Sequence, residues 1–309
     1  MSKEKTLYTG LIPSPRDDRD YILSSSMPTV KRYPKEKPLP FDLDIHDQTI
    51  IPSCVGMSCA AIKEGSERLE KVDKVFDGHW IYYKCKEIDN YSGKGTYLRT
   101  GFKVLKDTGA KPSDVDPDKL SEENPIKYRI KAYARVDDIS FEGLKKALSI
   151  YHFLVAGFKG SNEGWKEELI RPPKEGESEW GHAVTLVGYD EDHIIGQNSW
   201  GDYSWVHNDS GGYFKTTKDY LPFEAWAVLL DKPNEISTVK DEVKGYVAYE
   251  FTKVEEGEIM VNTSYGLRLR EEPTTESLTL EVLPDKTKIK TTGELSYSNG
   301  WNWLPVLKN

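Results

Sequence analysis

The most informative stretch of the chain reads Asp47-Gln48-Thr49-Ile50-Ile51-Pro52-Ser53-Cys54-Val55-Gly56-Met57-Ser58-Cys59-Ala60-Ala61. Pro52 and Ser53 form a helix start signal, because proline stops the preceding extended chain and serine can cap the first backbone amides. Cys54 is therefore expected in the first turn of a helix. There, unpaired N–H groups and the helix macrodipole lower the pKa of a thiol and favour the nucleophilic thiolate. The same N–H groups could receive the negative oxygen that forms when a thiolate attacks a carbonyl.

A reactive cysteine also needs a base and a group that orients this base. The chain supplies candidates far downstream, in Gly181-His182-Ala183-Val184 and in Gln197-Asn198-Ser199-Trp200-Gly201. With Gln48 and Cys54 they give the order Gln, Cys, His-Ala, Asn-Ser-Trp-Gly. In this order the sequence resembles the papain-like cysteine peptidases of bacteria or phages, over roughly residues 11–230. The resemblance implies an α+β fold with two lobes, a helical lobe followed by a β lobe, and an active site between them.

The resemblance also implies a role for each motif residue. Cys54 would be the nucleophile, and His182 would pair with it and protonate the leaving amine. Asn198 would accept the imidazole N–H and fix the orientation of the ring. The side-chain amide of Gln48 and the backbone N–H of Cys54 would hold the oxyanion.

Three further residues have supporting roles in this reading. Trp200 would shield the hydrogen bond between His182 and Asn198 from water. Such a bond is stronger when water is excluded. Trp205 would pack beside the same ring, with an ordinary place in the core as the alternative. Gly95, in a turn before a predicted helix, would contribute backbone to the substrate cleft, with an ordinary turn as the alternative.

Cys59 is the rival nucleophile, because Gly56-Met57-Ser58-Cys59 echoes the Gly-Ser-Cys of the family. The six-residue step from Gln48 favours Cys54, and Cys59 lies more than a turn inside the predicted helix. Pro52 and Val55 depart from the family pattern around the nucleophile, so an inert Cys54 remains an alternative. The other five histidines lack the context of His182.

The 309 residues predict two domains. Residues 1–40 are expected to form an extended strap or a removable pro-segment, and residues 41–231 the peptidase domain. Residues 232–245 are interpreted as a linker, and residues 246–309 as an all-β domain. Within the peptidase domain, the patterns predict helices at 54–72, from 80, at 97–106 and at 140–149, and strands at 130–136, 151–158, 182–189, 193–200 and 211–215.

Two stretches near the C-terminus carry a second resemblance. Gly266-Leu267-Arg268-Leu269-Arg270-Glu271-Glu272-Pro273 and Gly300-Trp301-Asn302-Trp303-Leu304-Pro305-Val306 resemble strands of bacterial SH3-like domains. That resemblance implies a small β-barrel that binds cell-wall peptides or glycans, or that packs beside a catalytic domain. Peptidoglycan is therefore the partner implied for residues 246–309.

Composition narrows the class of protein. A net charge of −9 argues against nucleic-acid binding and against attachment to anionic membranes. No apolar run approaches the ~20 residues that span a bilayer, and none follows the charged start as a signal peptide would require. The expected location is therefore the cytoplasm, or the exterior after non-classical release or lysis. Three cysteines do not make a disulfide framework, and neither metal-ligand spacing nor a phosphate-binding loop occurs, so no cofactor or metal is expected.

The sequence thus predicts a cysteine endopeptidase that acts through a thioester acyl-enzyme on proteins or on peptidoglycan peptides. A catalytically silent protein that binds peptides or cell wall on the same fold is the first alternative. A transamidase that uses the same acyl-thioester is the second.

Overall fold

The computed structural model describes residues 9–27, 33–38, 43–113, 124–201, 212–229, 243–255, 258–291 and 296–307. The chain divides into two compact units, Met1–Ile236 and Ser237–Asn309. The predicted linker at 232–245 lies mostly outside the described residues, although strand β7 already begins at Val243. Among the described residues, no helix combines the length and the apolar character that crossing a bilayer requires.

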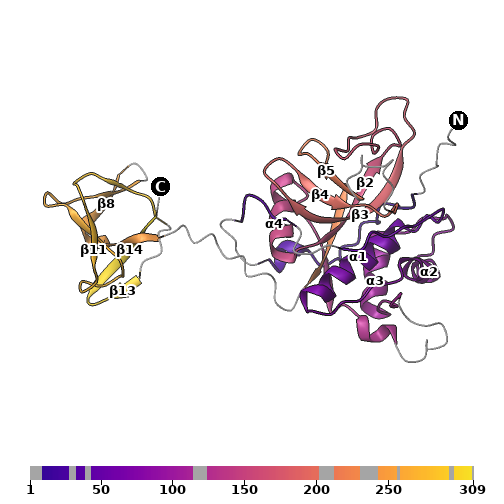
Figure 1. The fold of residues 1–309 in the computed structure, drawn as a ribbon, viewed down its shortest axis with the longest axis horizontal. Helices are drawn as coiled ribbons and strands as arrows, with labels where there is room; N and C mark the ends of the chain where they lie inside the picture. The colour runs from indigo at the N-terminus through magenta and orange to yellow at the C-terminus, as the bar shows by residue number, and fades with distance from the viewer. Residues whose placement is uncertain are drawn as a thin grey trace. The chain divides into compact units, whose positions relative to one another are not determined.

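The helices of the first unit lie where the sequence predicts helices (Figure 1). They are α1 (Cys54–Leu69), α2 (Gly78–Ile88), α3 (Leu98–Asp107) and α4 (Phe141–Tyr151), with short 3₁₀ turns η1 (Leu23–Ser25) and η3 (Pro125–Tyr128). The predicted cap of α4 is confirmed, because the Ser140 hydroxyl accepts a hydrogen bond from the backbone N–H of Gly143 at 3.1 Å.

Two other predicted caps are wrong. Ser53 occupies the N-cap position of α1, but its hydroxyl donates to the Ile51 carbonyl and contacts His79 Nδ1 instead of the first helical amides. Tyr97, and not Thr96, is the N-cap residue of α3. The first turn of α1 therefore has no side-chain cap, and its N–H groups are left for other partners.

One antiparallel sheet forms the β part of the first unit, with strand order β1-β6-β2-β3-β4-β5. The strands are β1 (Ala132–Arg135), β2 (Leu154–Gly160), β3 (Trp180–Tyr189), β4 (Ile194–Gln197), β5 (Tyr213–Thr216) and β6 (Glu224–Leu229). Strand β2 begins later than predicted, because α4 continues to Tyr151, and β6 was not predicted. The α+β class, with a helical part followed by a β part, is confirmed.

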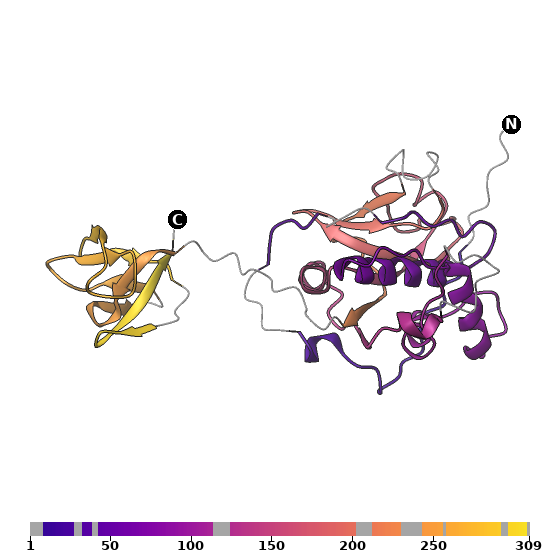
Figure 2. The same ribbon diagram turned by 60° about the horizontal axis from the view of Figure 1, so that its bottom comes forward.

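The sheet separates two apolar cores, because successive side chains of a strand point to opposite faces. On β2, Ala156 and Phe158 belong to the core that contains α4 residues such as Leu144. Val155 belongs to the other core, together with residues of α1 and α3. Helix α1 lies alongside β3 in both views of the ribbon (Figures 1 and 2). The start of α1 is therefore brought to the face of β3.

The second unit is all-β in the residues that the structure describes there, apart from the 3₁₀ turn η4 (Tyr249–Phe251). One sheet has the order β11-β10-β7-β14-β13 and the other β12-β9-β8. Their strands are β7 (Val243–Ala248), β8 (Thr252–Glu255), β9 (Glu258–Val261), β10 (Leu267–Arg270), β11 (Thr279–Leu283), β12 (Lys288–Ile289), β13 (Ser296–Ser298) and β14 (Trp301–Leu307). A closed SH3-like barrel stays a prediction.

Candidate active site

His182 and Asn198 meet at one end of the six-stranded sheet. His182 lies on β3, opposite Phe158 of β2, and Asn198 directly follows β4. Because β3 and β4 are neighbours, the two residues 16 positions apart come together, with His182 Nε2 2.7 Å from Asn198 Oδ1. Both side chains are buried, so their hydrogen bond is sheltered from water.

Three tryptophan rings surround the imidazole of His182. The Trp200 ring stacks on it, with centroids 4.6 Å apart and planes 21° apart. The rings of Trp165 and Trp180 approach it edge-on, at 5.5 and 5.8 Å. Trp180 lies two residues before His182 on β3, so the period of the strand puts both on one face. The sequence reasoning missed Trp165 and Trp180, and only Trp180 had a local signal.

Gln48 is held against the same segment. Its backbone N–H donates to the Ser199 carbonyl at 2.9 Å, and its Oε1 accepts from the Ser199 hydroxyl at 2.8 Å. Its Nε2 donates to the Ile51 carbonyl at 3.2 Å, within the turn that leads to Cys54. With Ser199 holding the amide oxygen, the amide nitrogen contacts the turn at Ile51, three residues before Cys54. Ser199 lies inside the predicted motif, but no role was assigned to it.

Cys54 is the first residue of α1, as predicted, and it is 0% exposed. Burial raises the pKa of its thiol to about 11, whereas backbone hydrogen bonds from Ala183, Gly10, Val55 and Cys54 itself act in the opposite direction. The N–H groups at the helix start thus lower this pKa as expected, but burial outweighs them, so the predicted net direction of the shift is wrong for the described conformation. The hydrogen bond from Ala183, the neighbour of His182, brings the sulfur next to the histidine segment.

The rival cysteine lies deeper. Cys59 is also fully buried, and burial raises its pKa well above the ordinary value of a thiol. Its sulfur packs against Gly101 of α3, inside the core between the helices. This is the environment of an inert structural thiol.

A segment near the N-terminus, residues 9–14, contacts Cys54 and pairs with β3 and with the turn before α3, and we call it the strap. Leu11 N–H donates to the Gly181 carbonyl at 3.1 Å, on the β3 side. On the α3 side, Thr96 N–H donates to the Gly10 carbonyl at 2.8 Å, and Ile12 N–H donates to the Thr96 carbonyl at 3.0 Å. The strap therefore pairs with β3 on one side and with Thr96 on the other. The Cys54 sulfur accepts a hydrogen bond from the Gly10 N–H.

The Leu11 side chain packs against Gly157 of β2 and is 3% exposed. It belongs to the apolar core on the α1 side of the sheet. A Cβ on Gly157 of β2 would lie 2.5 Å from Leu11 Cδ2, so a side chain at position 157 would clash with the leucine. The absence of a side chain at Gly157 thus makes room for Leu11.

Polar contacts anchor the chain that follows Leu11. Ser14 donates its backbone N–H and its hydroxyl to Glu224 Oε1, at 3.2 and 3.4 Å. Asp20 accepts two hydrogen bonds from the Arg99 guanidinium, at 2.7 and 2.6 Å. The Glu224 carboxyl is 3% exposed, and burial raises its pKa above the usual range. These contacts tie the strap to β6 and α3.

The other predicted residues have mixed outcomes. Gly95 touches the strap, since a Cβ there would lie 2.5 Å from the Gly10 carbonyl oxygen, but the neighbouring Thr96 makes the backbone hydrogen bonds. Trp205 lies outside the described residues. Among the rival histidines, His46 Nε2 lies 3.0 Å from Glu64 Oε1, and His79 contacts Ser53. Within the described ranges, no group of three or more His, Cys, Asp and Glu side chains is placed to hold a metal ion.

Known proteins provide independent comparisons. The family model described as papain family cysteine protease matches residues 43–222. No curated protein gives a significant sequence match. Among solved structures, xylellain, a cysteine protease from Xylella fastidiosa, superposes with a TM-score of 0.61 at 24% identity, over 74% of this chain and 98% of that chain.

Two further structures are similar to this chain. One is proCathepsin B S9 from Trypanosoma congolense, with a TM-score of 0.59 at 16% identity, over 74% of this chain and 87% of that chain. The other is the digestive procathepsin L2 proteinase from Tenebrio molitor larval midgut, with a TM-score of 0.57 at 19% identity, over 72% of this chain and 78% of that chain. These identities establish a shared fold. Because the family model itself spans more than half of the 309 residues, the chain belongs to the papain family and is a cysteine peptidase, a hydrolase.

Proposed function

We propose that Cys54, His182 and Asn198 form the catalytic triad of this peptidase. The observation that carries the proposal is the buried 2.7 Å hydrogen bond between His182 and Asn198. Ala183, the residue after His182 on β3, donates a backbone hydrogen bond to the Cys54 sulfur, which links the pair to the cysteine. A cysteine, a base within the same buried site and a group that orients the base are the parts that nucleophilic catalysis requires.

In the proposed reaction the Cys54 thiolate attacks the carbonyl carbon of a peptide bond. His182, protonated in the ion pair, gives its proton to the leaving amine as the C–N bond breaks, and a thioester remains on the sulfur. Neutral His182 then takes a proton from water, and the hydroxide attacks the thioester. A carboxylic acid leaves, and the thiol–imidazole pair is restored.

Gln48 is the proposed side-chain donor to the oxyanion, with the Cys54 backbone N–H as the second donor. Two contacts support this role, because Ser199 occupies the amide oxygen of Gln48 and the amide nitrogen contacts the turn at Ile51, three residues before Cys54. The absence of a side-chain cap on α1 leaves its first N–H groups available for a developing negative charge.

We further infer that the described conformation is a covered form of the enzyme. A peptide cannot reach the sulfur of Cys54, which is 0% exposed and accepts a hydrogen bond from the Gly10 backbone. The strap must therefore be displaced or cut before catalysis. This makes the strap an inhibitory segment, whether or not it is removed.

The proposed substrates are proteins or the peptides of peptidoglycan. The second unit, proposed as an SH3-like module, is the reason to include cell wall. Cleavage of denatured casein and the loss of turbidity of a cell-wall suspension separate the two substrate classes.

One experiment tests the function directly. Wild type, Leu11→Asp and Cys54→Ala chains are incubated with denatured casein and, separately, with iodoacetamide, and all masses are recorded. We expect casein cleavage and labelling of Cys54 in Leu11→Asp, slower reactions in wild type, and neither in Cys54→Ala. Cleavage that persists in Cys54→Ala would refute the triad.

Two other outcomes select the alternatives. Stoichiometric labelling of Cys54 without cleavage of any substrate would favour a catalytically silent binding protein. Products that carry an added amine, when an amine acceptor is supplied, would favour a transamidase.

A further inference from the structure

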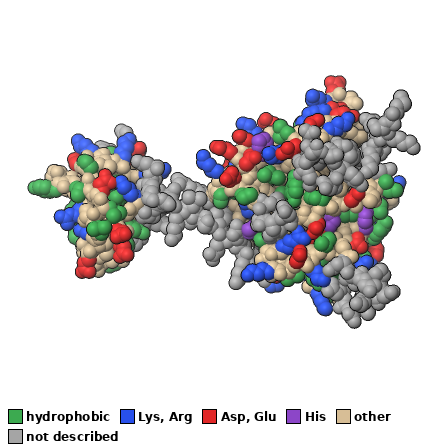
Figure 3. All heavy atoms as spheres, in the orientation of Figure 1, with side chains coloured by type: hydrophobic (Ala, Val, Ile, Leu, Met, Phe, Trp, Pro, Cys, Tyr) green, Lys and Arg blue, Asp and Glu red, His purple; other side chains and the backbone are tan. Residues whose placement is uncertain are grey.

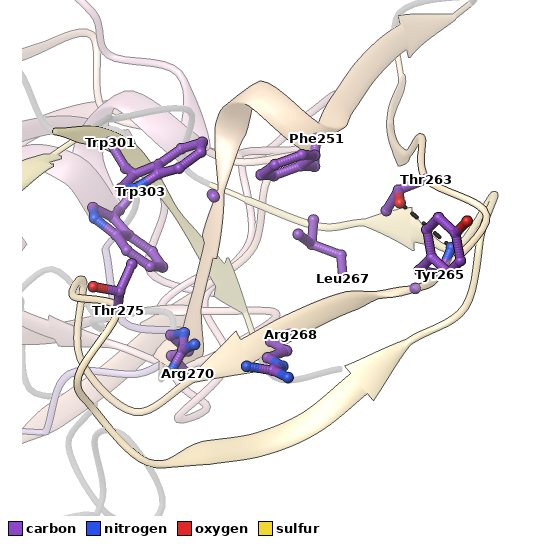
Figure 4. A pocket seen from close by; sticks show the side chains of 11 residues that line it. Phe251, Thr263, Tyr265, Leu267, Arg268, Arg270, Thr275, Trp301 and Trp303 are labelled. Carbon is purple, nitrogen blue, oxygen red and sulfur yellow. Dashed lines mark hydrogen bonds between the residues drawn. The ribbon is translucent and has the colours of Figure 1, made fainter. Parts of the chain in front are cut away.

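The second unit contains a pocket of about 340 Å³ that has no part in the proposed chemistry of Cys54 (Figure 4). Residues from η4, β10, β14 and the turn before β10 line it. A volume of this size accommodates a few residues of a peptide or a small sugar. The side chains that carry the inference are Phe251, Tyr265, Arg268, Arg270, Trp301 and Trp303.

Charge in the pocket has one sign. Arg268 and Arg270 of β10 both line the pocket, and the strand is irregular between Leu269 and Arg270. Arg270 is steadied by a hydrogen bond from Nη1 to the Ser277 carbonyl at 2.8 Å, whereas Arg268 is exposed. Among the lining residues that the structure describes, these two arginines are the charged ones. A chain with a net charge of −9 therefore presents a basic site here.

Aromatic rings form the rest of the recognition surface. Phe251 and Trp301 stack with centroids 5.5 Å apart and planes 29° apart, which fixes both rings. Trp303 is held by a hydrogen bond from its ring N–H to the Ser298 carbonyl at 3.1 Å. Tyr265 is 94% exposed at the rim. In Figure 4 the rings of Phe251 and Trp301 lie above and the two arginines below.

We propose that this pocket binds a short peptide segment that carries a carboxylate. A guanidinium pairs with a carboxylate through parallel hydrogen bonds, and the fixed rings offer apolar faces to the neighbouring side chains and backbone. The proposal does not depend on the activity of Cys54. It makes the second unit a holder for acidic peptide substrates or for acidic peptides near the substrate.

Charge and surface pattern favour a peptide over a nucleic acid. Polyanion binding needs a basic stripe that follows many phosphates. Two arginines do not make such a stripe, and Figure 3 shows both acidic and basic side chains on the face of this unit that it displays. A single carboxylate, or two, matches the charge of the pocket.

The test uses the full chain with Cys54→Ala, so that a bound peptide is not cleaved. The probe is fluorescein-labelled Gly-Ala-Glu-Ala-Glu-Ala with a free C-terminus, and its neutral counterpart has glutamine for glutamate and an amidated C-terminus. Binding is followed by fluorescence polarisation. We expect the acidic probe to bind, the neutral probe to bind at least about tenfold more weakly, and added salt to weaken the acidic probe.

Substitutions locate the binding site. Arg268→Gln should weaken the acidic probe by about tenfold or more, and Tyr265→Ala, at an exposed position that folding does not need, by a smaller factor. Lys290→Gln is the matched control, because it removes one exposed cation of the same unit outside the pocket. Equal binding of both probes, or unchanged binding by Arg268→Gln, would overturn the proposal. The proposal would also be overturned if neutral chitotriose or a single-stranded oligodeoxynucleotide bound more tightly than the acidic probe and if Tyr265→Ala abolished this binding.

Discussion

The two units present their candidate sites in opposite states. In the first unit Cys54 is fully buried and contacts the strap, whereas in the second unit Tyr265 is 94% exposed and Arg268 faces solvent. A covered site needs a conformational step before it meets a ligand, and an open site does not. The difference teaches that binding by the second unit should be independent of the event that uncovers the first.

The largest expected effect is the loss of peptide cleavage by the first unit while the second unit still binds its probe. Cys54→Ala or His182→Ala should abolish peptide cleavage, because no other described group supplies the thiolate or its base. The same Cys54→Ala chain should bind the acidic probe of the second unit. Cys59→Ala should largely retain cleavage, and casein digestion read by mass spectrometry checks all three. Loss of cleavage in Cys59→Ala, with Cys54→Ala active, would reverse the assignment.

Gln48→Ala should lower kcat/KM by ~10²–10³, the usual cost of losing one oxyanion donor. Ser199→Ala is the matched control. It removes the 2.8 Å hydrogen bond that orients the Gln48 amide but keeps the amide donor itself. We expect a much smaller loss for Ser199→Ala in steady-state kinetics. Equal losses would mean that Gln48 acts by holding the loop together and not as a donor.

Leu11→Asp should open the covered site. Burying a leucine side chain contributes about 1.5–3 kcal/mol, and a buried carboxylate costs more, so the covered form should be disfavoured at least about tenfold. The measured quantity is the rate at which iodoacetamide labels Cys54. Arg16→Ala, at an exposed position shortly after the strap, should leave the rate unchanged. An unchanged rate in Leu11→Asp would show that the strap does not limit access.

The pH profile of labelling offers the smallest but most specific test. Thiolate is the reactive form, so in wild type the labelling rate should rise with pH until about 11, the pKa that burial gives Cys54. In Leu11→Asp the burial is relieved while the N–H groups near the sulfur stay, so the rise should occur at lower pH. Superimposed profiles would contradict burial by the strap as the cause of the high pKa.

The sequence predicted the features that depend on local chemistry. The helix start at Cys54 follows from Pro52, and the α4 start from the Ser140 cap, because both act within a few residues. Strand β6 was missed because its position depends on pairing with β2, where Val155 lies opposite Trp226. No local pattern around Glu224–Leu229 announces that pairing.

The pKa of Cys54 was predicted with the wrong sign for a related reason. Local sequence gives the helix terminus, which lowers a thiol pKa. It does not give the contact with Gly10, more than 40 residues away, or the burial of the sulfur. Trp165, likewise, reaches His182 only through the folding of a loop that no period in the sequence describes.

The amide of Asn198 has a consequence for proton placement in this enzyme. Its Oδ1 lies 2.7 Å from His182 Nε2 and also accepts the Ser199 backbone N–H at 2.8 Å. Flipping the amide would put an NH₂ group against two donors, so the oxygen is locked toward the ring. The neutral imidazole is thereby held in the Nε2–H tautomer, and Nδ1 is the nitrogen left to exchange protons in the proposed reaction.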